Sequence, residues 1–291
     1  MRLFYVFLIL LSNNNLFSTN FSINPKEKNK KLNQLILYEV GTYSLGLVAM
    51  NELWYKNYPK SNFHFINDNS SWLQMDKMGH MATSYYSGVN GIKLYRWAGI
   101  DEKKAIWIGG LRGTFYNSII EILDGFSENW GASIGDFASN SFGSFIAISQ
   151  ELYWKEQGIL IKYSYSRSDL SYQNSELFGD NFFQRTFKDY NGQTYWISMN
   201  INSMFRVDNS QFPDWLNLAL GHSAKGMTSP NNTTNDGRYR QFFLSFDIDL
   251  MRIKSKNKIL NVLSNVFGYI KIPFPTIEYT NNQFTLHPIY F

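Results

Sequence analysis

Asp76 and His80 bring an acid and an imidazole together in the short stretch DKMGH, with Lys77 beside the acid. The two residues are four positions apart, so on a helix they lie on the same face. An imidazole near a carboxylate can act as a general acid or base or as a metal ligand. It can equally be a hydrogen-bonded core histidine, since buried polar groups are normally satisfied. Both interpretations of His80 stay open at this point.

Two later segments also place polar residues at helical spacing among apolar and small ones. The residues concerned are Asn117, Glu121 and Asp124 in the first segment, and Ser133, Asp136, Asn140 and Gly143 in the second. Three helices would then each present a polar stripe. We expect these stripes to converge in one helical core, because a shared interior can satisfy all of them together.

The ionisable side chains of this set could form a catalytic or metal-binding site. The candidates for either role are His80, Glu121, Asp124 and Asp136. One histidine and three carboxylates suit a divalent Mn, Fe or Zn ion better than calcium, which prefers oxygen ligands.

The alternative to a metal site is a structural polar network. In it the acids pair with Lys77 and Arg112, because an uncompensated buried acid is costly. The remaining polar or small residues, which are Asp76, Lys77, Asn117, Ser133, Asn140 and Gly143, then have structural roles.

In their order and spacing, these motifs resemble those of the YfiM-like predicted periplasmic lipoproteins, an envelope family of unknown function. They are more distantly similar to VanZ-like membrane proteins. The resemblance matches D-K-x-x-H to DKMGH, E-x-x-D to EILD, and S-x-x-D-x-x-x-N-x-x-G to SIGDFASNSFG. The segments KDYNGQTYWIS, WLNLALGHSAKGM and FLSFDIDL resemble the longer members found in Bacteroidetes. The resemblance implies an envelope role and helices in or at a membrane, but no established chemistry.

The composition favours a protein that meets a membrane. Of the 291 residues, 18% are aromatic, which suits a surface in contact with lipid headgroups; an aromatic-rich core is the alternative. A net charge of +4 without a dense Lys/Arg block gives no footprint for nucleic acid. Cysteine is absent, so the chain has no disulfide, no thiol nucleophile and no cysteine to acylate, which departs from the lipoprotein pattern. Motifs of phosphate-binding loops and of serine hydrolases are also missing.

The N-terminus predicts export. Arg2 precedes the apolar run Leu3 to Leu11, which is too short to span a bilayer but fits the hydrophobic region of a secretory signal. We expect residues 1–22 to be a signal peptide. The expected location is therefore the periplasm or the outer membrane.

Residues 31–157 predict a four-helix bundle. The four helical segments are Leu32 to Tyr55, a segment from Asn69 or Ser70 onward, Asp101 to Gly125, and a segment entered through Ser133. Gly109 and Gly113 are four apart in the third segment, which would let two helix backbones approach closely.

Residues 158–291 predict an antiparallel β region, forming a partly open sheet or a small barrel-like one. The hydrophobic period changes to two in ILIKYSYS, QTYWISMNI, WLNLALGHS and YRQFFLSFDIDL. A short helical pattern, NKILNVLSNVFG, precedes the last extended segments. His222 follows a strand-like run and is expected to lie in a turn. The fold class is therefore α+β.

Two functions are consistent with this sequence. The first is an exported structural or binding protein of the envelope, associated with the outer membrane, whose partner is a membrane or envelope lipid; the sequence does not identify a protein partner. The second is a metal-dependent or acid–base hydrolase of an envelope lipid or glycan, acting through His80, Glu121, Asp124 and Asp136.

Overall fold

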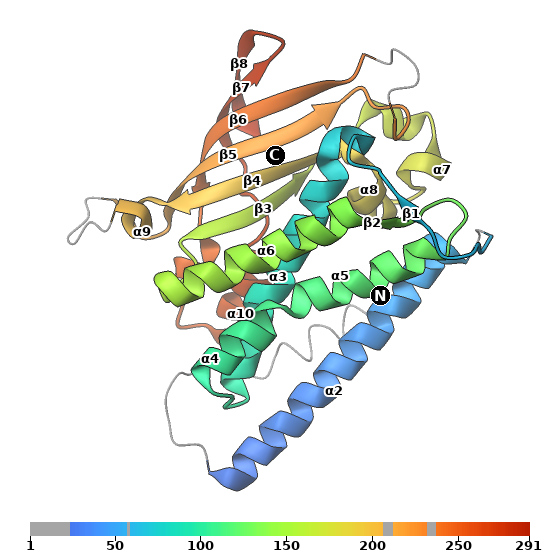
Figure 1. Cartoon of the computed structure of the whole chain (residues 1–291). Coiled ribbons are helices and arrows are strands. Elements are labelled where there is room, and N and C mark those ends of the chain that lie inside the picture. Colours follow the sequence, from blue (N-terminus) through green and yellow to red (C-terminus); the bar gives the residue numbers. More distant parts are fainter. Residues whose placement is uncertain (1–23, 57–58, 206–211, 232–236) are drawn as a thin grey trace. The chain divides into compact units, whose positions relative to one another are not determined.

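The chain is a mixed α and β protein that divides into two compact units (Figure 1). The computed structural model describes residues 24–56, 59–205, 212–231 and 237–291, so the predicted signal peptide lies outside the described residues. The helical unit comprises the described part of Met1–Asn67 together with Thr83–Lys155. The β unit comprises Asp68–Ala82 and Glu156–Phe291. Helix α3 contributes its first turns to the β unit and the rest to the helical unit.

The helical unit contains the long helices that the hydrophobic period predicts. Their bounds are Pro25–Met50 for α2, Met75–Trp97 for α3, Arg112–Gly125 for α5 and Ile134–Tyr153 for α6; the short α4 is Glu102–Lys104. A π-helical turn, Asn51–Tyr55, extends α2. The 3-10 turn that precedes α3, Ser71–Gln74, belongs to the β unit. The short strands β1 (Phe65–Ile66) and β2 (Ala132–Ser133) pair in parallel.

The third predicted helix is interrupted rather than continuous. Asp101 starts it, accepting a hydrogen bond from the Lys104 amide at 3.3 Å. A π-helical segment, Ala105–Gly109, follows, and α5 begins only at Arg112. A Cβ added to Gly109 would lie 2.6 Å from the carbonyl carbon of Gly91 on α3, so glycine is required where the two backbones touch.

The start of α6 follows the expected capping pattern. Ser133 has extended backbone geometry, and its Oγ accepts a hydrogen bond from the Asp136 amide at 3.1 Å. This bond satisfies one of the amides that have no partner within the helix. Asp136 in the first turn also complements the helix dipole.

The β unit is built on a six-stranded antiparallel sheet in which the strands follow the chain order (Figure 1). The strands are β3 (Ile159–Tyr165), β4 (Gln193–Asn200), β5 (Leu216–Lys225), β6 (Tyr239–Ile248), β7 (Phe274–Thr280) and β8 (Gln283–Tyr290). Short helices lie in the connections: α7 (Ser175–Phe178), α8 (Phe182–Lys188), α9 (Ile201–Phe205) and α10 (Lys258–Phe267). The NKILNVLSNVFG pattern is therefore helical, as expected.

His222 lies in a strand and not in a turn, so that expectation is wrong. It sits within β5, opposite Tyr195 of β4 and Phe242 of β6. The small and polar residues of GHSAK resemble a turn, but pairing with two neighbouring strands extends β5 to Lys225. Tertiary context overrides local propensity here, as it commonly does in sheets.

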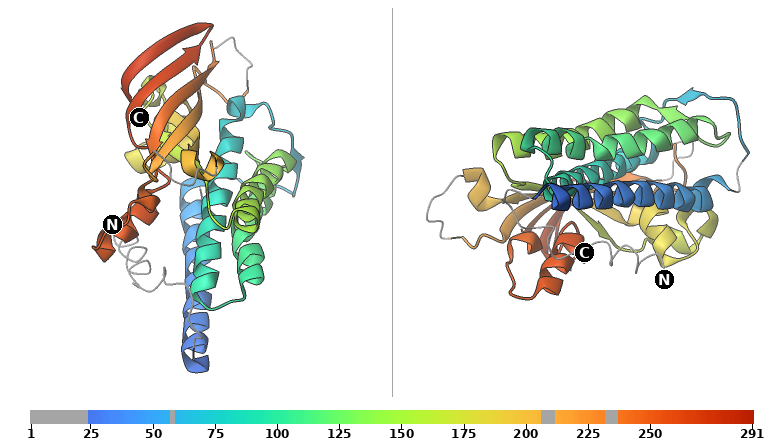
Figure 2. Two further views of the ribbon diagram at one scale, coloured as in Figure 1. Left: turned by 90° about the vertical axis from the view of Figure 1, so that its left-hand side faces the viewer. Right: turned by 90° about the horizontal axis from the view of Figure 1, so that it is seen from below.

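The sheet curls, so its inner face is partly enclosed. Tyr290 of β8 contacts two residues of β4, four strands away: its hydroxyl lies 3.3 Å from Thr194 Oγ1, and its ring centroid lies 6.0 Å from that of Trp196. The left view of Figure 2 shows the twist of these strands. In the described residues, the two end strands β3 and β8 do not pair with each other, so the sheet is open.

Part of the open edge at β3 is covered by the chain itself. The Tyr163 amide donates to the Tyr269 carbonyl, and the Lys271 amide donates to the Tyr163 carbonyl, both at 2.9 Å. At the opposite edge, Pro288 lies in β8 beside a register shift in the pairing with β7. A proline is tolerated there because an edge strand need not donate on both sides.

The two faces of the sheet have unusual polarity. The inner face buries polar side chains: Ser198, Asn217, Ser223, Gln241, Ser245, Asp247, Thr276 and Glu278. The outer face exposes apolar ones: Ile197, Leu220, Phe242, Leu244, Phe246, Ile277, Tyr279, Phe284, Leu286 and Ile289. Five of these form one row across neighbouring strands, namely Ile197, Leu220, Leu244, Ile277 and Leu286.

Candidate functional site

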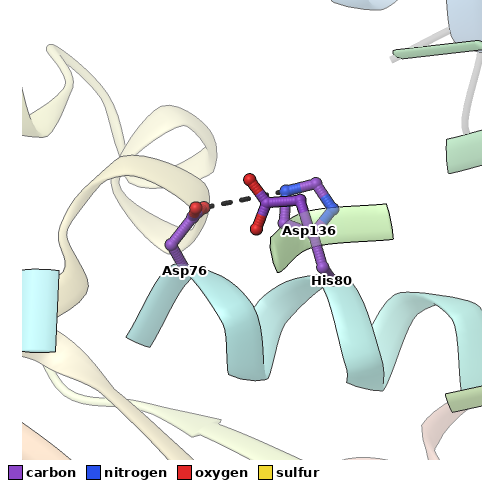
Figure 3. Close-up of side chains that lie close together, drawn as sticks. All are labelled: Asp76, His80 and Asp136. Carbon is purple, nitrogen blue, oxygen red and sulfur yellow. Dashed lines mark ion pairs between the residues drawn. The ribbon is translucent and has the colours of Figure 1, made fainter. Parts of the chain in front are cut away.

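Asp76 and His80 lie one turn apart at the start of α3, on the same face of the helix (Figure 3). His80 Nε2 is 3.8 Å from Asp76 Oδ1. Tyr190 donates its hydroxyl proton to the same Oδ1 at 2.8 Å, so the carboxylate is held in place from a second direction. Both side chains are about one fifth exposed, at 19% and 20%. A carboxylate at this distance from an imidazole is compatible with acid–base chemistry, metal ligation or a structural pair.

Lys77 forms ion pairs with two acids at this position. Its Nζ lies 2.7 Å from Asp68 Oδ2 and 3.3 Å from Asp76 Oδ2. The lysine side chain is only 11% exposed, so its charge is screened less by water than that of a surface lysine. Lys77 therefore belongs to a local ion-pair network around Asp76.

In the helical unit, Asn117 and Asn140 form a buried amide network with Ser84. Asn117 Nδ2 donates to Ser84 Oγ and to Asn140 Oδ1, both at 2.9 Å, and Ser84 Oγ donates to Asn140 Oδ1 at 3.2 Å. The three residues come from α5, α6 and α3, and none is more than 3% exposed. The network therefore ties three helices together at one level of the unit.

Glu121 and Asp136 are brought together through Ser133. The Ser133 amide donates to Glu121 Oε2 at 3.1 Å, while its hydroxyl caps the Asp136 amide. Glu121 is 6% exposed and Asp136 is 4% exposed. The helical unit thus buries two carboxyl groups around the N-terminus of α6, where amide dipoles favour negative charge.

Asp124 is engaged by a residue that the sequence does not single out. Tyr55 donates its hydroxyl proton to Asp124 Oδ1 at 2.7 Å. Burial, with the charge of Asp124 added to it, raises the pKa of the Tyr55 hydroxyl well above its ordinary value. Tyr55 therefore stays protonated and acts as a donor.

Gly143, the remaining candidate of the polar and small set, is buried in α6.

Arg112 pairs with α2 rather than with the candidate acids. Its Nε lies 2.8 Å and 3.0 Å from the two carboxylate oxygens of Glu39, and its two terminal nitrogens donate to Ser87 and Thr42. Glu39 is one of two acids in the apolar segment Leu32–Tyr55, and the other, Glu52, pairs with Lys56. An acid in the middle of such an apolar segment is a signal that it needs a cationic partner.

The candidate metal donors are divided between the two units. His80 belongs to the β unit, whereas Glu121, Asp124 and Asp136 belong to the helical unit; Asp136 is also drawn in Figure 3. A metal site made from this set would need donors from both units. Metal binding by these residues stays a prediction.

The inner face of the sheet holds an ion cluster that the sequence motifs do not indicate. Lys162 Nζ lies 2.8 Å from Asp247 Oδ2, and Lys271 Nζ lies 3.9 Å from Asp247 Oδ1. All three side chains are fully buried, with no exposed area. Ser198 Oγ also donates to Asp247 Oδ2, at 2.6 Å.

This cluster carries two ammonium groups and one carboxylate, so the charges do not balance. Burial, and then the nearby charge of Lys162, lower the pKa of Lys271 to about 8, although Asp247 opposes the shift. A signal was present in the sequence: Lys162 and Asp247 occupy strand positions that alternate with apolar residues, so they face the same side as neighbouring serines.

No family model matches the chain, and neither a curated protein nor a solved structure matches it.

Proposed function

We propose that this chain is an exported envelope protein, related to the YfiM-like family, that binds the lipid surface of the outer membrane. In this proposal the outer face of the sheet is the main lipid-binding surface. The helical unit packs as a four-helix bundle and adds a second apolar surface. The protein acts as a binding or structural component rather than as an enzyme.

The observation that carries the proposal is the polarity of the sheet. The ten outer-face side chains defined above are between 39% and 76% exposed, and none is charged. The opposite face buries serines, asparagines and an aspartate around a small apolar cluster of Trp196, Ala219 and Phe243. A sheet in water normally has the reverse arrangement, with apolar side chains on the covered face.

Energetic considerations favour hydrocarbon as the solvent of the outer face. Each square ångström of apolar surface moved out of water contributes about 25 cal/mol, so a face of this size gains several kcal/mol on contact with lipid. Single exposed apolar residues are normal on soluble proteins, whereas a contiguous row of them typically marks an interaction surface. A lipid surface requires no specific polar partner. At one end this face also carries His222 and Arg240, whose side chains lie 3.2 Å apart, so the apolar row is the uncharged part of the face.

The helical unit gives independent support, because its helices also expose large apolar side chains. These include Ile36, Leu37, Val40 and Val48 of α2, Phe115 and Ile122 of α5, and Ile134, Phe142, Phe145 and Tyr153 of α6. None of the described helices is both long and apolar enough to cross a membrane. The proposal therefore uses the helices as lipid-contacting surfaces.

Vesicle flotation tests the proposal. The full chain, purified in detergent and mixed with phosphatidylcholine vesicles before the detergent is removed, should float with the vesicles. The double variant Leu244→Thr and Ile277→Thr should float several-fold less, because two residues of the apolar row become polar. Threonine suits a strand, so the sheet should be retained.

The matched control is Thr285→Asn, which changes a polar residue of β8. This variant should float as well as the unchanged chain, and circular dichroism should be the same for all three proteins. The proposal fails if the unchanged chain is recovered in the fraction without vesicles. It also fails if the double variant floats as well as the unchanged chain.

A second candidate function is a metal-dependent or acid–base hydrolase acting on an envelope lipid or glycan. The observation in its favour is the Asp76–His80 pair, in which the carboxylate is fixed by Tyr190 and lies 3.8 Å from the imidazole. Measurement of metal content in the detergent-purified protein, before and after dialysis against a chelator, would test it.

A further inference from the structure

The segment around α10 is basic and contains no acid. The sequence has no Asp or Glu between Asp249 and Glu278. Arg252 is already paired with Asp249 at 3.3 Å and with Glu156 at 3.2 Å. The three lysines that follow at alternate positions, Lys254, Lys256 and Lys258, are exposed.

Helix α10 has one apolar and one polar face. Its apolar residues, which are Ile259, Leu260, Val262, Leu263, Val266 and Phe267, fall within one side of a helical projection, and Asn261, Ser264 and Asn265 fall on the other. No residue of the helix is buried. Ile259 is 68% exposed and Leu260 is 51% exposed, so part of the apolar face is open.

The polar face bonds back to the protein's own chain. Asn261 Oδ1 accepts from the Ser255 amide at 2.9 Å, and Asn261 Nδ2 donates to the Ser255 carbonyl at 2.8 Å. These two bonds fix the lysine-bearing turn against the start of the helix. The lysines and the exposed apolar residues are thereby held within one short segment.

We propose that Lys254–Phe267 is an interfacial segment that binds anionic lipid headgroups. The ammonium groups of Lys254, Lys256 and Lys258 contact the headgroup phosphates, while Ile259, Leu260 and Phe267 enter the acyl-chain boundary. This combination of a cationic run and an apolar helix face is what binding at an anionic bilayer surface requires. The inference rests on the proposed membrane function and names the class of lipid.

The test compares binding of the full chain to vesicles of phosphatidylcholine with and without phosphatidylglycerol. The unchanged chain should bind the anionic vesicles more tightly, and added salt should weaken this preference. The triple variant Lys254→Gln, Lys256→Gln and Lys258→Gln should lose affinity for anionic vesicles, on the order of fivefold for each lysine. Its affinity for neutral vesicles should not change.

The matched control carries the same change in charge elsewhere. Lys103, Lys104 and Lys155 are exposed lysines of the helical unit, and their replacement by Gln should leave the preference for anionic vesicles intact. A second variant, Ile259→Ser with Leu260→Ser, should weaken binding to both kinds of vesicle, because it removes the inserted apolar surface.

Two outcomes would overturn the inference while leaving the proposed function standing. One is equal binding of the unchanged chain to neutral and anionic vesicles. The other is a triple lysine variant that keeps the full anionic preference. If the unchanged chain binds neither kind of vesicle, the proposed function itself fails.

Discussion

Lys162, Asp247 and Lys271 place an excess positive charge inside the sheet, fully out of water. Asp247 can neutralise one ammonium group, and its bonds to Ser198 and Lys162 favour the nearer one. Lys271 is left with the Ile272 carbonyl at 2.8 Å, Ser245 Oγ at 3.3 Å and a longer contact to the carboxylate. The protein therefore tolerates a charged Lys271 at a cost, because burial penalises the ammonium form.

The cost of charging Lys271 predicts that stability rises with pH. Its pKa falls from 10.5 in the unfolded chain to about 8 in the folded protein, so between these values the unfolded chain binds more protons. The free energy of unfolding should then increase from about pH 8 to pH 10.5, by at most about 3 kcal/mol. Denaturant unfolding across this range measures the increase.

The variant Lys271→Met isolates the contribution of this lysine. Methionine fills similar space without charge. In this variant the free energy of unfolding should rise less between pH 8 and pH 10.5 than in the unchanged protein, and it should be higher near pH 7. Lys103→Met, at an exposed position, should show the same dependence of the free energy of unfolding on pH as the unchanged protein. An unaltered slope in Lys271→Met would show that another group titrates.

Replacement of His80 tests whether this residue has a metal-binding or acid–base role or a structural one. In the structural interpretation, which we favour, His80→Ala deprives Asp76 of a neighbour and lowers the free energy of unfolding by about 1 to 3 kcal/mol. Thermal unfolding and metal content, measured on the detergent-purified protein, should show a lower melting temperature and no lost metal.

His64→Ala is the control for the loss of an imidazole. His64 lies in the helical unit, where its Nδ1 is 3.3 Å from Ser61 Oγ, and it is not among the candidate ligands. This variant should keep whatever metal the unchanged protein holds. A fully stable His80→Ala protein that has lost a bound transition metal would contradict the structural interpretation.

At the scale of the elements, periodic patterns predicted most helices and strands, because hydrophobic period and capping are local properties. Ser133 caps α6 as expected, and the period-two segments form strands of one antiparallel sheet. The expected helix and strand bounds differ from the observed ones where contacts between distant parts of the sequence determine the local structure. The break before α5 lies where the backbone of Gly109 approaches that of Gly91, and β5 continues through His222 because two neighbouring strands pair with it.

The sequence also pointed to several candidate-site residues without giving their partners. Asn117 and Asn140 could be placed on helix faces, but their meeting at Ser84 depends on packing of three helices. Tyr55 carries no motif, so its bond to Asp124 was not foreseen. The ion cluster in the sheet was missed because strands β3 and β6 are distant in sequence, and only the folded sheet brings Lys162 to Asp247.

At the scale of the whole molecule, large apolar side chains are exposed both on the outer face of the sheet and on the helices of the helical unit. Export through the predicted signal would bring these surfaces to a membrane. On the inner face, Ser198 bonds to Asp247 and to Asn217, and such buried pairs gain strength where water is excluded. The α10 segment then sets which headgroups are preferred.

The central claim is that the outer face of the sheet contacts lipid, and a probe at Leu244 tests it most directly. The chain has no cysteine, so Leu244→Cys can carry a single bimane fluorophore on the outer face, and Glu176→Cys, at an exposed position of α7, serves as the aqueous control. With the full chain bound to vesicles, nitroxide-labelled lipid should quench the label at residue 244 strongly, and iodide in the water should quench it weakly. The label at residue 176 should behave in the opposite way. Equal quenching of both labels by iodide, with no effect of the nitroxide lipid at residue 244, would contradict the account.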